Sequence, residues 1–297
     1  MIERLLEAAE TAAFAAGTAI LDIYASDFAV ARKSDASPVT LADGRAEAII
    51  LRHLAAAAPD IPVIAEEQAE ALGLPDRIPP RFWLVDPLDG TKEFVKRNGE
   101  FTVNIALIEH GEPVLGVIGI PVKGVIYGAA GPDTAYVVDT SGRIRSIAAR
   151  HCPAHGATVA YSRSHADTTR LEDWLADYAI ADRIVAGSAL KFCLIAEGVA
   201  DLYPRFGPTM EWDTAAGQAL VEAAGGSMTR LDGSPFRLRQ GRLPQPWIRR
   251  AGAELKPLAR TAGEGGTRRV SAGRVRVAPL RKRPNEARDS GCYGVAS

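Results

Sequence analysis

The first part of the chain repeats apolar positions with the period of an α-helix. Residues 2–25 place Leu5, Ala9 and Ile20 on or near one face, which predicts a long helix packed on a core. A turn rich in Ser and Asp follows, and residues 40–58 then predict a second helix. The chain therefore begins with two helices.

Two short apolar runs come next, and each ends in acidic residues. Residues 61–65 predict a strand that stops at Glu66 and Glu67, and residues 82–85 predict a strand that stops at Asp86. Both acidic sites are therefore expected at strand ends, where loops commonly carry functional groups.

The pattern changes again along the rest of the chain. From residue 101 to 138, short apolar segments separated by Gly and Pro turns predict an antiparallel sheet. Past about residue 150, strand-like and helix-like segments alternate, as in α/β folds. We predict an α/β (α+β) layered sandwich with two subdomains, residues 1–140 and 141–236, and with the acidic residues meeting between them.

Charge sets the last part of the chain apart. Residues 1–236 hold 20 Lys and Arg against 32 Asp and Glu, whereas residues 237–297 hold 15 against 4. The tail also has 13 Arg, 13 Gly and Pro, only 10 Leu, Ile and Val, and no Phe. This composition is typical of disorder, so residues 237–297 are predicted to be a disordered basic tail.

Bulk features favour a cytoplasmic protein. Cys152, Cys193 and Cys292 form no CxxC pair, which suits a reducing compartment. No run approaches the roughly 20 apolar residues of a membrane span, and residues 1–24 lack the basic and apolar regions of a signal peptide. We expect no transmembrane segment; peripheral association with the inner membrane is left open, as is the oligomeric state.

The segment DPLDGT carries the candidate chemistry. It places Asp86 and Asp89 on one sharp turn, while Glu66 and Asp213 lie at other predicted junctions. Carboxylates gathered from three segments suit hard divalent cations, which predicts a site for two Mg²⁺ ions and phosphate chemistry. The alternative is an ordinary turn whose Asp and Thr side chains cap a helix.

The same turn offers groups for a phosphate and a water. Gly90 permits close backbone approach, and Thr91 can open a helix whose N–H groups hold a phosphate. Thr91 and Asp43 could accept a water's proton through a hydroxyl relay. Taken alone, Asp43 is better explained as a helix cap.

A second anion site is suggested further along. Ser188 and Lys191 place a hydroxyl and a cation one helical turn apart after a predicted strand. Arg205 is interpreted as surface-exposed unless a dianionic substrate is demonstrated. His165 in YSRSH is interpreted as structural when it is considered alone.

Four segments together resemble the inositol monophosphatase superfamily, and within it the bacterial 3'(2'),5'-bisphosphate nucleotidases. They are IAEEQ, then WLVDPLDGTKEFVKRNGEFTVNIALI, then YSRSH with GSALKFCLIAEGVADLYPR, and GPTMEWDTAAGQALVEAAGG. DPLDGT is typical of the superfamily, and KEFVKRNGEFTVNIALI with LKFCLIAEG favours the nucleotidase branch. The resemblance covers essentially residues 1–236 and implies the layered αβαβα sandwich of the inositol monophosphatase and fructose-1,6-bisphosphatase type.

The resemblance also implies roles for individual residues. The two or three Mg²⁺ ions would be held by the side chains of Glu66, Asp86, Asp89 and Asp213 and by the Leu88 carbonyl. Thr91 with Asp43 would activate the attacking water. The scissile phosphate would meet Gly90 and Thr91, and the nucleotide with its 5'-phosphate would be bound by His165, Ser188, Lys191 and Arg205.

The implied reaction is hydrolysis of adenosine 3',5'-bisphosphate to AMP and phosphate, which removes a by-product of sulfate assimilation and is sensitive to lithium. Ala189 stands where a second Ser is usual, which puts only a minor contact in doubt. The sequence leaves two rivals: an inositol or sugar phosphatase, and an inactive nucleotide- or metal-binding protein. Lys191 and Arg205 favour the nucleotide.

The resemblance stops after residue 236. Related chains continue through a Tyr-Gly turn and an Asn-Pro into a final apolar strand, whereas this chain continues RLRQGRLPQPWIRR. One hypothesis is that residues 237–297 are translated out of frame; the alternative is a genuine basic extension. Specific nucleic-acid binding by residues 237–297 is not expected, because Trp247 and Tyr293 are the only aromatic residues in this segment.

Overall fold

Two long helices begin the chain and pack against each other. The computed structural model describes residues 1–32, 38–163, 168–230, 233–238 and 247–250. Helix α1 spans Ile2–Tyr24 and helix α2 spans Leu41–Ala57, within one residue of the predicted bounds. Between them, β1 (Val30–Arg32) and β2 (Pro38–Thr40) form an antiparallel pair.

A seven-stranded sheet follows, with its strands in the order β3-β4-β5-β6-β7-β8-β9. The strands are β3 Val63–Ala65, β4 Arg81–Asp89, β5 Thr102–Glu109, β6 Glu112–Ile120, β7 Val125–Ala129, β8 Tyr136–Asp139 and β9 Ile144–Ser146. The pair β3 and β4 is parallel, and all later neighbours are antiparallel, as the sequence predicts for this part.

Short helices interrupt this sheet. Helix α3 (Glu66–Leu72) begins directly after β3, α4 (Thr91–Val95) begins after β4, and the 3₁₀ turn η1 spans Pro121–Lys123. Among the elements described so far, the sequence-based prediction lacks β1, β2, α3, η1 and β9. The three residues of β9 are all exposed, so no alternation of apolar and polar side chains announces that strand.

The second sheet has five strands in the order β11-β10-β12-β14-β13. Its elements, in chain order with their helices, are β10 Ala157–Ser162, α5 Thr168–Leu175, β11 Ile180–Ala186, α6 Leu190–Ala196, β12 Leu202–Arg205, α7 Ala215–Ala223, β13 Ser227–Thr229 and β14 Trp247–Arg250. Strand β10 is parallel to β11 and β12, whereas β14 is antiparallel to β12 and β13. The predicted alternation of strands and helices is confirmed.

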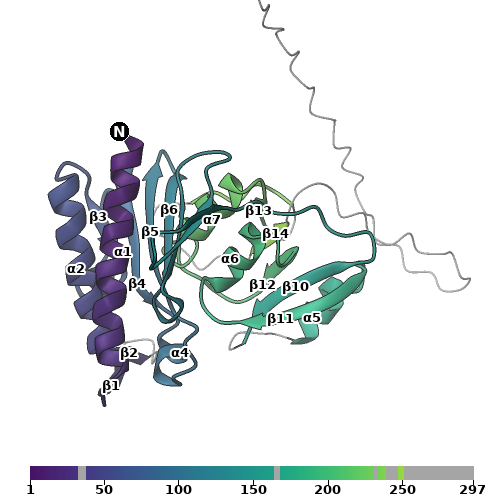
Figure 1. The fold of residues 1–297 in the computed structure, drawn as a ribbon, viewed down its shortest axis with the longest axis horizontal. Helices are drawn as coiled ribbons and strands as arrows, with labels where there is room; N and C mark the ends of the chain where they lie inside the picture. The colour runs from purple at the N-terminus through teal and green to yellow at the C-terminus, as the bar shows by residue number, and fades with distance from the viewer. Residues whose placement is uncertain (33–37, 164–167, 231–232, 239–246, 251–297) are drawn as a thin grey trace, which may run out of the picture. The chain divides into compact units, whose positions relative to one another are not determined.

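The elements stack in layers around three apolar cores (Figure 1). One core lies between α1, α2 and one face of the seven-stranded sheet and includes Trp83 and Ile105. The opposite face packs on α6 and α7, where Phe192 and Leu220 are buried. Leu171 and Leu175 of α5 pack with β10 and β12 in a third, smaller core. The layered α+β fold is confirmed.

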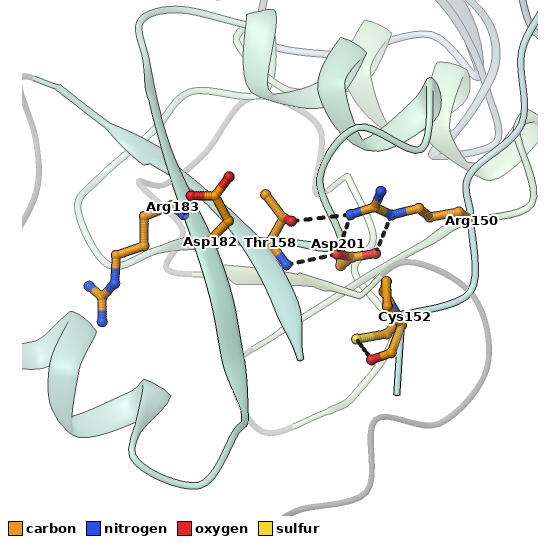
Figure 2. Close-up of polar contacts among 7 residues, drawn as sticks. Arg150, Cys152, Thr158, Asp182, Arg183 and Asp201 are labelled. Carbon is orange, nitrogen blue, oxygen red and sulfur yellow. Dashed lines mark hydrogen bonds and ion pairs between the residues drawn. The ribbon is translucent and has the colours of Figure 1, made fainter. Parts of the chain in front are cut away.

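A half-buried ion pair fixes the entry into the second sheet (Figure 2). The Asp201 side chain has no exposed surface, and its two oxygens accept from Arg150 Nε and Nη2, each at 2.9 Å. Asp201 Oδ2 also accepts from the Thr158 backbone N–H at 2.7 Å. The carboxylate thereby ties the segment before β10 to the segment before β12, a geometry that favours charge-assisted bonds.

The domain boundaries stay a prediction. The described residues all belong to a compact unit that spans Met1–Leu258. Four residues of the predicted tail, Trp247–Arg250, form β14, whereas residues 239–246 and 251–297 lie outside the described residues. In the described part of the chain, no helix has the length and apolar character needed to cross a membrane.

Candidate metal and phosphate site

The DPLDGT turn ends strand β4 inside the molecule. The regular pairing of β4 with β5 is shifted between Asp86 and Asp89, so the strand bends where the two carboxylates lie. Asp86 is 1% exposed, and its Oδ1 accepts from the Leu88 N–H at 3.0 Å. Gly90 has φ +90°, and an added Cβ would lie 3.0 Å from the Glu100 carbonyl oxygen. Only glycine suits this turn.

Thr91 and Asp43 meet, although 48 residues separate them in the chain. Thr91 Oγ1 lies 3.1 Å from Asp43 Oδ1 and 3.2 Å from the Leu88 carbonyl oxygen. Asp43 Oδ2 accepts from Thr40 N at 2.7 Å and from Thr40 Oγ1 at 2.8 Å. Asp43 therefore caps α2 with one oxygen and faces Thr91 with the other; the cap is confirmed, and the proton relay stays a prediction.

Glu66 is the first residue of α3, and Glu47 of α2 holds that helix in place. The Glu67 N–H donates to Glu47 Oε2 at 2.8 Å, and the Gln68 N–H donates to Oε1 at 3.0 Å. Glu47 is 5% exposed. Sequence reasoning missed it; the signal was its position four residues after Asp43, on the same face of α2.

Asp213 precedes α7 and is oriented by the residues just before it. Thr209 Oγ1 donates to Asp213 Oδ2 at 2.7 Å, and the Met210 N–H donates to the same oxygen at 3.1 Å. Arg205 Nη2 lies 3.8 Å from that oxygen and donates to the Pro208 carbonyl at 3.0 Å. Arg205 thus lies near the acidic residues and not at a distant surface.

The four carboxylates influence one another. Burial, and then the negative charges of Glu66, Asp89 and Asp213, raise the pKa of Asp86 well above its ordinary value. Burial and the charge of Asp213 raise the pKa of Asp89 to about 6, against a hydrogen bond from Ser188 and the charges of Lys191 and Arg205. The structure therefore brings Glu66, Asp86, Asp89 and Asp213 into one negatively charged cluster.

This cluster fits hard divalent cations by its chemistry. Crowded carboxylates need either protons or cations to offset their repulsion, and oxygen donors are what Mg²⁺ prefers. Among the described residues, no three His, Cys, Asp or Glu side chains already have the spacing of a complete ligand set.

The Ser188 turn lies against the other end of the cluster. Ser188 Oγ donates to Asp89 Oδ2 at 2.8 Å and to the Asp89 carbonyl oxygen at 3.0 Å. The same hydroxyl lies 2.6 Å from Thr102 Oγ1. Lys191 is 1% exposed; its Nζ donates to the Ser188 carbonyl at 2.6 Å and to the Ala186 carbonyl at 3.0 Å. The Lys191 ammonium therefore faces its own turn. His165 lies outside the described residues.

Known proteins with similar sequences carry consistent names. The 3'(2'),5'-bisphosphate nucleotidase CysQ of Escherichia coli O157:H7 is 48% identical over 223 residues, covering 74% of this chain and 88% of the relative. The protein of the same name from Salmonella typhimurium is 49% identical over 227 residues, covering 76% and 88%.

Solved structures agree on the fold. CysQ from Bacteroides thetaiotaomicron, described as a bacterial member of the inositol monophosphatase family, superposes with a TM-score of 0.69 at 36% identity, covering 84% of this chain and 97% of that one. The extragenic suppressor protein SuhB from Bartonella henselae superposes with a TM-score of 0.66 at 25% identity, covering 83% and 93%. The inositol monophosphatase family model matches residues 1–256, and the chain belongs to that family.

Proposed function

We propose that this protein is a magnesium-dependent phosphatase of bisphosphate nucleotides that converts adenosine 3',5'-bisphosphate to AMP and phosphate. The observation that carries the proposal is the cluster of Glu66, Asp86, Asp89 and Asp213 beside the Thr91–Asp43 hydrogen bond. The choice of a nucleotide is supported by the relatives at 48–49% identity that are named bisphosphate nucleotidases.

The donor set suits Mg²⁺, on which members of this family typically depend. We propose that the four carboxylates and the Leu88 carbonyl hold two or three ions. Bound Mg²⁺ would neutralise charge on the phosphoryl oxygens and acidify a water molecule. The Leu88 carbonyl lies 3.2 Å from Thr91 Oγ1, so this ligand set borders the proposed proton relay directly.

Thr91 and Asp43 would move the proton of the attacking water. Thr91 Oγ1 accepts that proton as it passes its own to Asp43 Oδ1, which lies 3.1 Å away. The two hydrogen bonds from Thr40 to Asp43 Oδ2 hold the carboxylate with Oδ1 toward Thr91. The relay needs no movement of the main chain, because both side chains are in contact already.

The remaining residues would bind the substrate. We propose that Gly90 and Thr91 contact the scissile phosphate, since Gly90 adds no side chain to the approach. Arg205 and Lys191 add positive charge near Asp89, and both lower its pKa. Direct contact of Ser188, Lys191 and His165 with the nucleotide stays a prediction, as does a cytoplasmic location.

The test is phosphate release from adenosine 3',5'-bisphosphate by the full chain, with Mg²⁺ and with Mg²⁺ plus Li⁺. Inositol 1-phosphate serves as the comparison substrate at the same concentration. We expect preferential, lithium-sensitive release from the nucleotide. Faster release from inositol 1-phosphate would transfer the assignment to an inositol phosphatase, and a folded protein that releases phosphate from neither substrate would contradict the assignment of adenosine 3',5'-bisphosphate as the substrate.

A further inference from the structure

The Glu100 carboxylate joins three segments that are distant in the sequence. Glu100 lies just before β5, and its Oε2 accepts from the Gly187 N–H at 2.9 Å, in the turn between β11 and α6. Arg163, directly after β10, donates to the same carboxylate through Nε at 3.1 Å and through Nη2 at 2.8 Å. One side chain therefore links the seven-stranded sheet to two strand ends of the five-stranded sheet.

The turn that Glu100 holds is both crowded and strained. A Cβ added at Gly187 would lie 2.8 Å from Glu93 Cγ and 3.0 Å from the Glu100 carbonyl oxygen, so the turn lies directly on the Glu100 segment. Ser188 has φ +49°, in the left-handed region that residues with a Cβ rarely adopt. A strained residue persists only where its surroundings hold it in place.

The strained residue contacts the acidic cluster. Ser188 Oγ reaches Asp89 Oδ2 at 2.8 Å, so the position of the turn decides where that hydroxyl meets the carboxylate. Lys191 Nζ holds the Ser188 carbonyl from the other side, at 2.6 Å. The turn is thus held from within by Lys191 and from outside by Glu100.

We propose that Glu100 and Arg163 are positioning residues that hold the Ser188 turn against Asp89. Only the kinetic consequence of this proposal rests on the proposed function. Arg163 orients Glu100, because a guanidinium that binds a carboxylate through two nitrogens fixes its plane as well as its distance. The Arg163 side chain is 46% exposed, so the pair adds little to global stability and acts through geometry.

The chain offers a matched control pair. Arg183 of β11 also binds a carboxylate through two nitrogens, that of Glu172 in α5, with Nη2 at 2.8 Å from Oε2. Its side chain is 39% exposed, similar to Arg163, but in the described part of the chain the Glu172 carboxylate bonds to Arg183 and not to the Ser188 turn or the cluster. A substitution in this pair removes the same kind of Arg–carboxylate interaction at a position away from the Ser188 turn.

The experiment compares Glu100→Ala, Glu100→Gln and Arg163→Ala with Glu172→Ala and Arg183→Ala in the full chain. Hydrogen exchange of residues 186–191 reports on the turn without any substrate. Mg²⁺ titration reports on the cluster, and kcat and KM for adenosine 3',5'-bisphosphate report on function. Thermal melting of every variant excludes those that fail to fold.

We expect Glu100→Ala to speed exchange at residues 186–191 and to lower kcat about tenfold, which corresponds to about 1.4 kcal/mol, with KM within about twofold. Glu100→Gln keeps one acceptor for the Gly187 N–H and should show a smaller effect, similar to that of Arg163→Ala. Neither control variant should change the exchange of the turn.

Three results would overturn the proposal. The first is unchanged hydrogen exchange of the turn in Glu100→Ala, and the second is an equal effect in the control variants Glu172→Ala and Arg183→Ala. The third is a higher KM at constant kcat in Arg163→Ala, which would make Arg163 a substrate contact. If the wild-type chain does not hydrolyse the nucleotide, the proposed function fails by itself. The exchange and Mg²⁺ arms then still decide whether Glu100 and Arg163 position the turn.

Discussion

Asp89 shows how a single residue connects the two halves of the site. Its carboxylate receives Ser188 from the turn before α6, and its pKa responds to Asp213, Lys191 and Arg205 from the second half of the chain. Its neighbour in β4, Asp86, is more deeply buried and responds mainly to burial and then to Glu66. Substitutions at such residues should change metal binding and stability in opposite directions.

Asp89→Asn should nearly abolish Mg²⁺-dependent turnover while stabilising the metal-free protein at neutral pH. Because the folded pKa of Asp89 is raised to about 6 from 3.8, its contribution to stability is complete below the unfolded value and is lost as pH rises toward about 6. Asparagine cannot ionise, so the variant avoids a decrease of about 1 kcal/mol or more in the free energy of unfolding.

The measurement is urea unfolding in EDTA at about pH 4.5 and about pH 7, where linkage predicts the largest contrast. The exposed Asp60→Asn serves as the control. We expect the free energy of unfolding of the wild type to fall more between these two pH values than that of Asp89→Asn. An equal or smaller fall in the wild type would contradict the electrostatic account. Unchanged turnover in the folded variant would contradict the metal assignment.

Glu47→Gln should weaken Mg²⁺ binding without direct contact to the ion. Glutamine offers one acceptor oxygen in place of the two that hold the N–H groups of Glu67 and Gln68, so the start of α3 loses an anchor. Loss of such outer contacts typically costs about 10–100-fold in metal affinity. Isothermal titration with Mg²⁺ checks this, with exposed Glu3→Gln as the control; equal affinities would show that Glu66 needs no such anchor.

At the scale of elements, close approach of α7 decides where Asp213 lies. A Cβ at Gly116 of β6 would lie 2.5 Å from the Ala216 carbonyl oxygen, and a Cβ at Gly217 would lie 2.3 Å from Phe192 ring atoms. The two glycines let α7 contact both the first sheet and α6. Since Asp213 lies two residues before the start of α7, a displacement of this helix should move a candidate metal ligand.

Gly217→Ala should lower the free energy of unfolding by about 1–3 kcal/mol, the usual cost of overpacking a core. Gly44 supplies the matched control, because it lies in α2 with nothing within 4 Å of an added Cβ. Gly44→Ala should stabilise the protein by up to about 1 kcal/mol through helix propensity. Chemical denaturation measures both variants, and a neutral Gly217→Ala would show that α7 can shift freely.

At the scale of the whole molecule, β14 completes the second sheet. Residues Trp247–Arg250 pair with both β12 and β13, so the strand lies between two elements that otherwise have no shared neighbour in the sheet. The compact unit ends at Leu258. The departure of the sequence from its relatives after residue 236 therefore affects a strand of the second sheet as well as the tail.

A chain ending at Leu258 should keep the stability and turnover of the full chain, whereas one ending at Leu238 should lose several degrees in melting temperature. The reason is that the shorter chain lacks β14 and leaves unpaired those backbone groups of β12 and β13 that pair with it. Differential scanning calorimetry of the three lengths is the measurement. Equal melting temperatures would mean that the pairing of β14 adds nothing to stability.

Sequence alone determined the elements whose signals are local. The helix over residues 2–25, the strands around Asp86 and the turn that begins α4 at Thr91 follow from helical period, alternation and turn chemistry, all of which act within a few residues. The positions of Glu66, Asp86, Asp89 and Asp213 at predicted strand-helix junctions also suggested that they converge, and the pKa of Asp86 responds to the other three.

Only the tertiary structure decided which distant groups meet. Glu100 and Arg163 are 63 residues apart, and each by itself looks like a solvated charge. The sequence placed Lys191 in a predicted second anion site, and the structure buries its side chain with the ammonium against its own turn. Such placements depend on how two sheets and the helices between them pack, and packing over long sequence separations leaves no periodic trace in a single sequence.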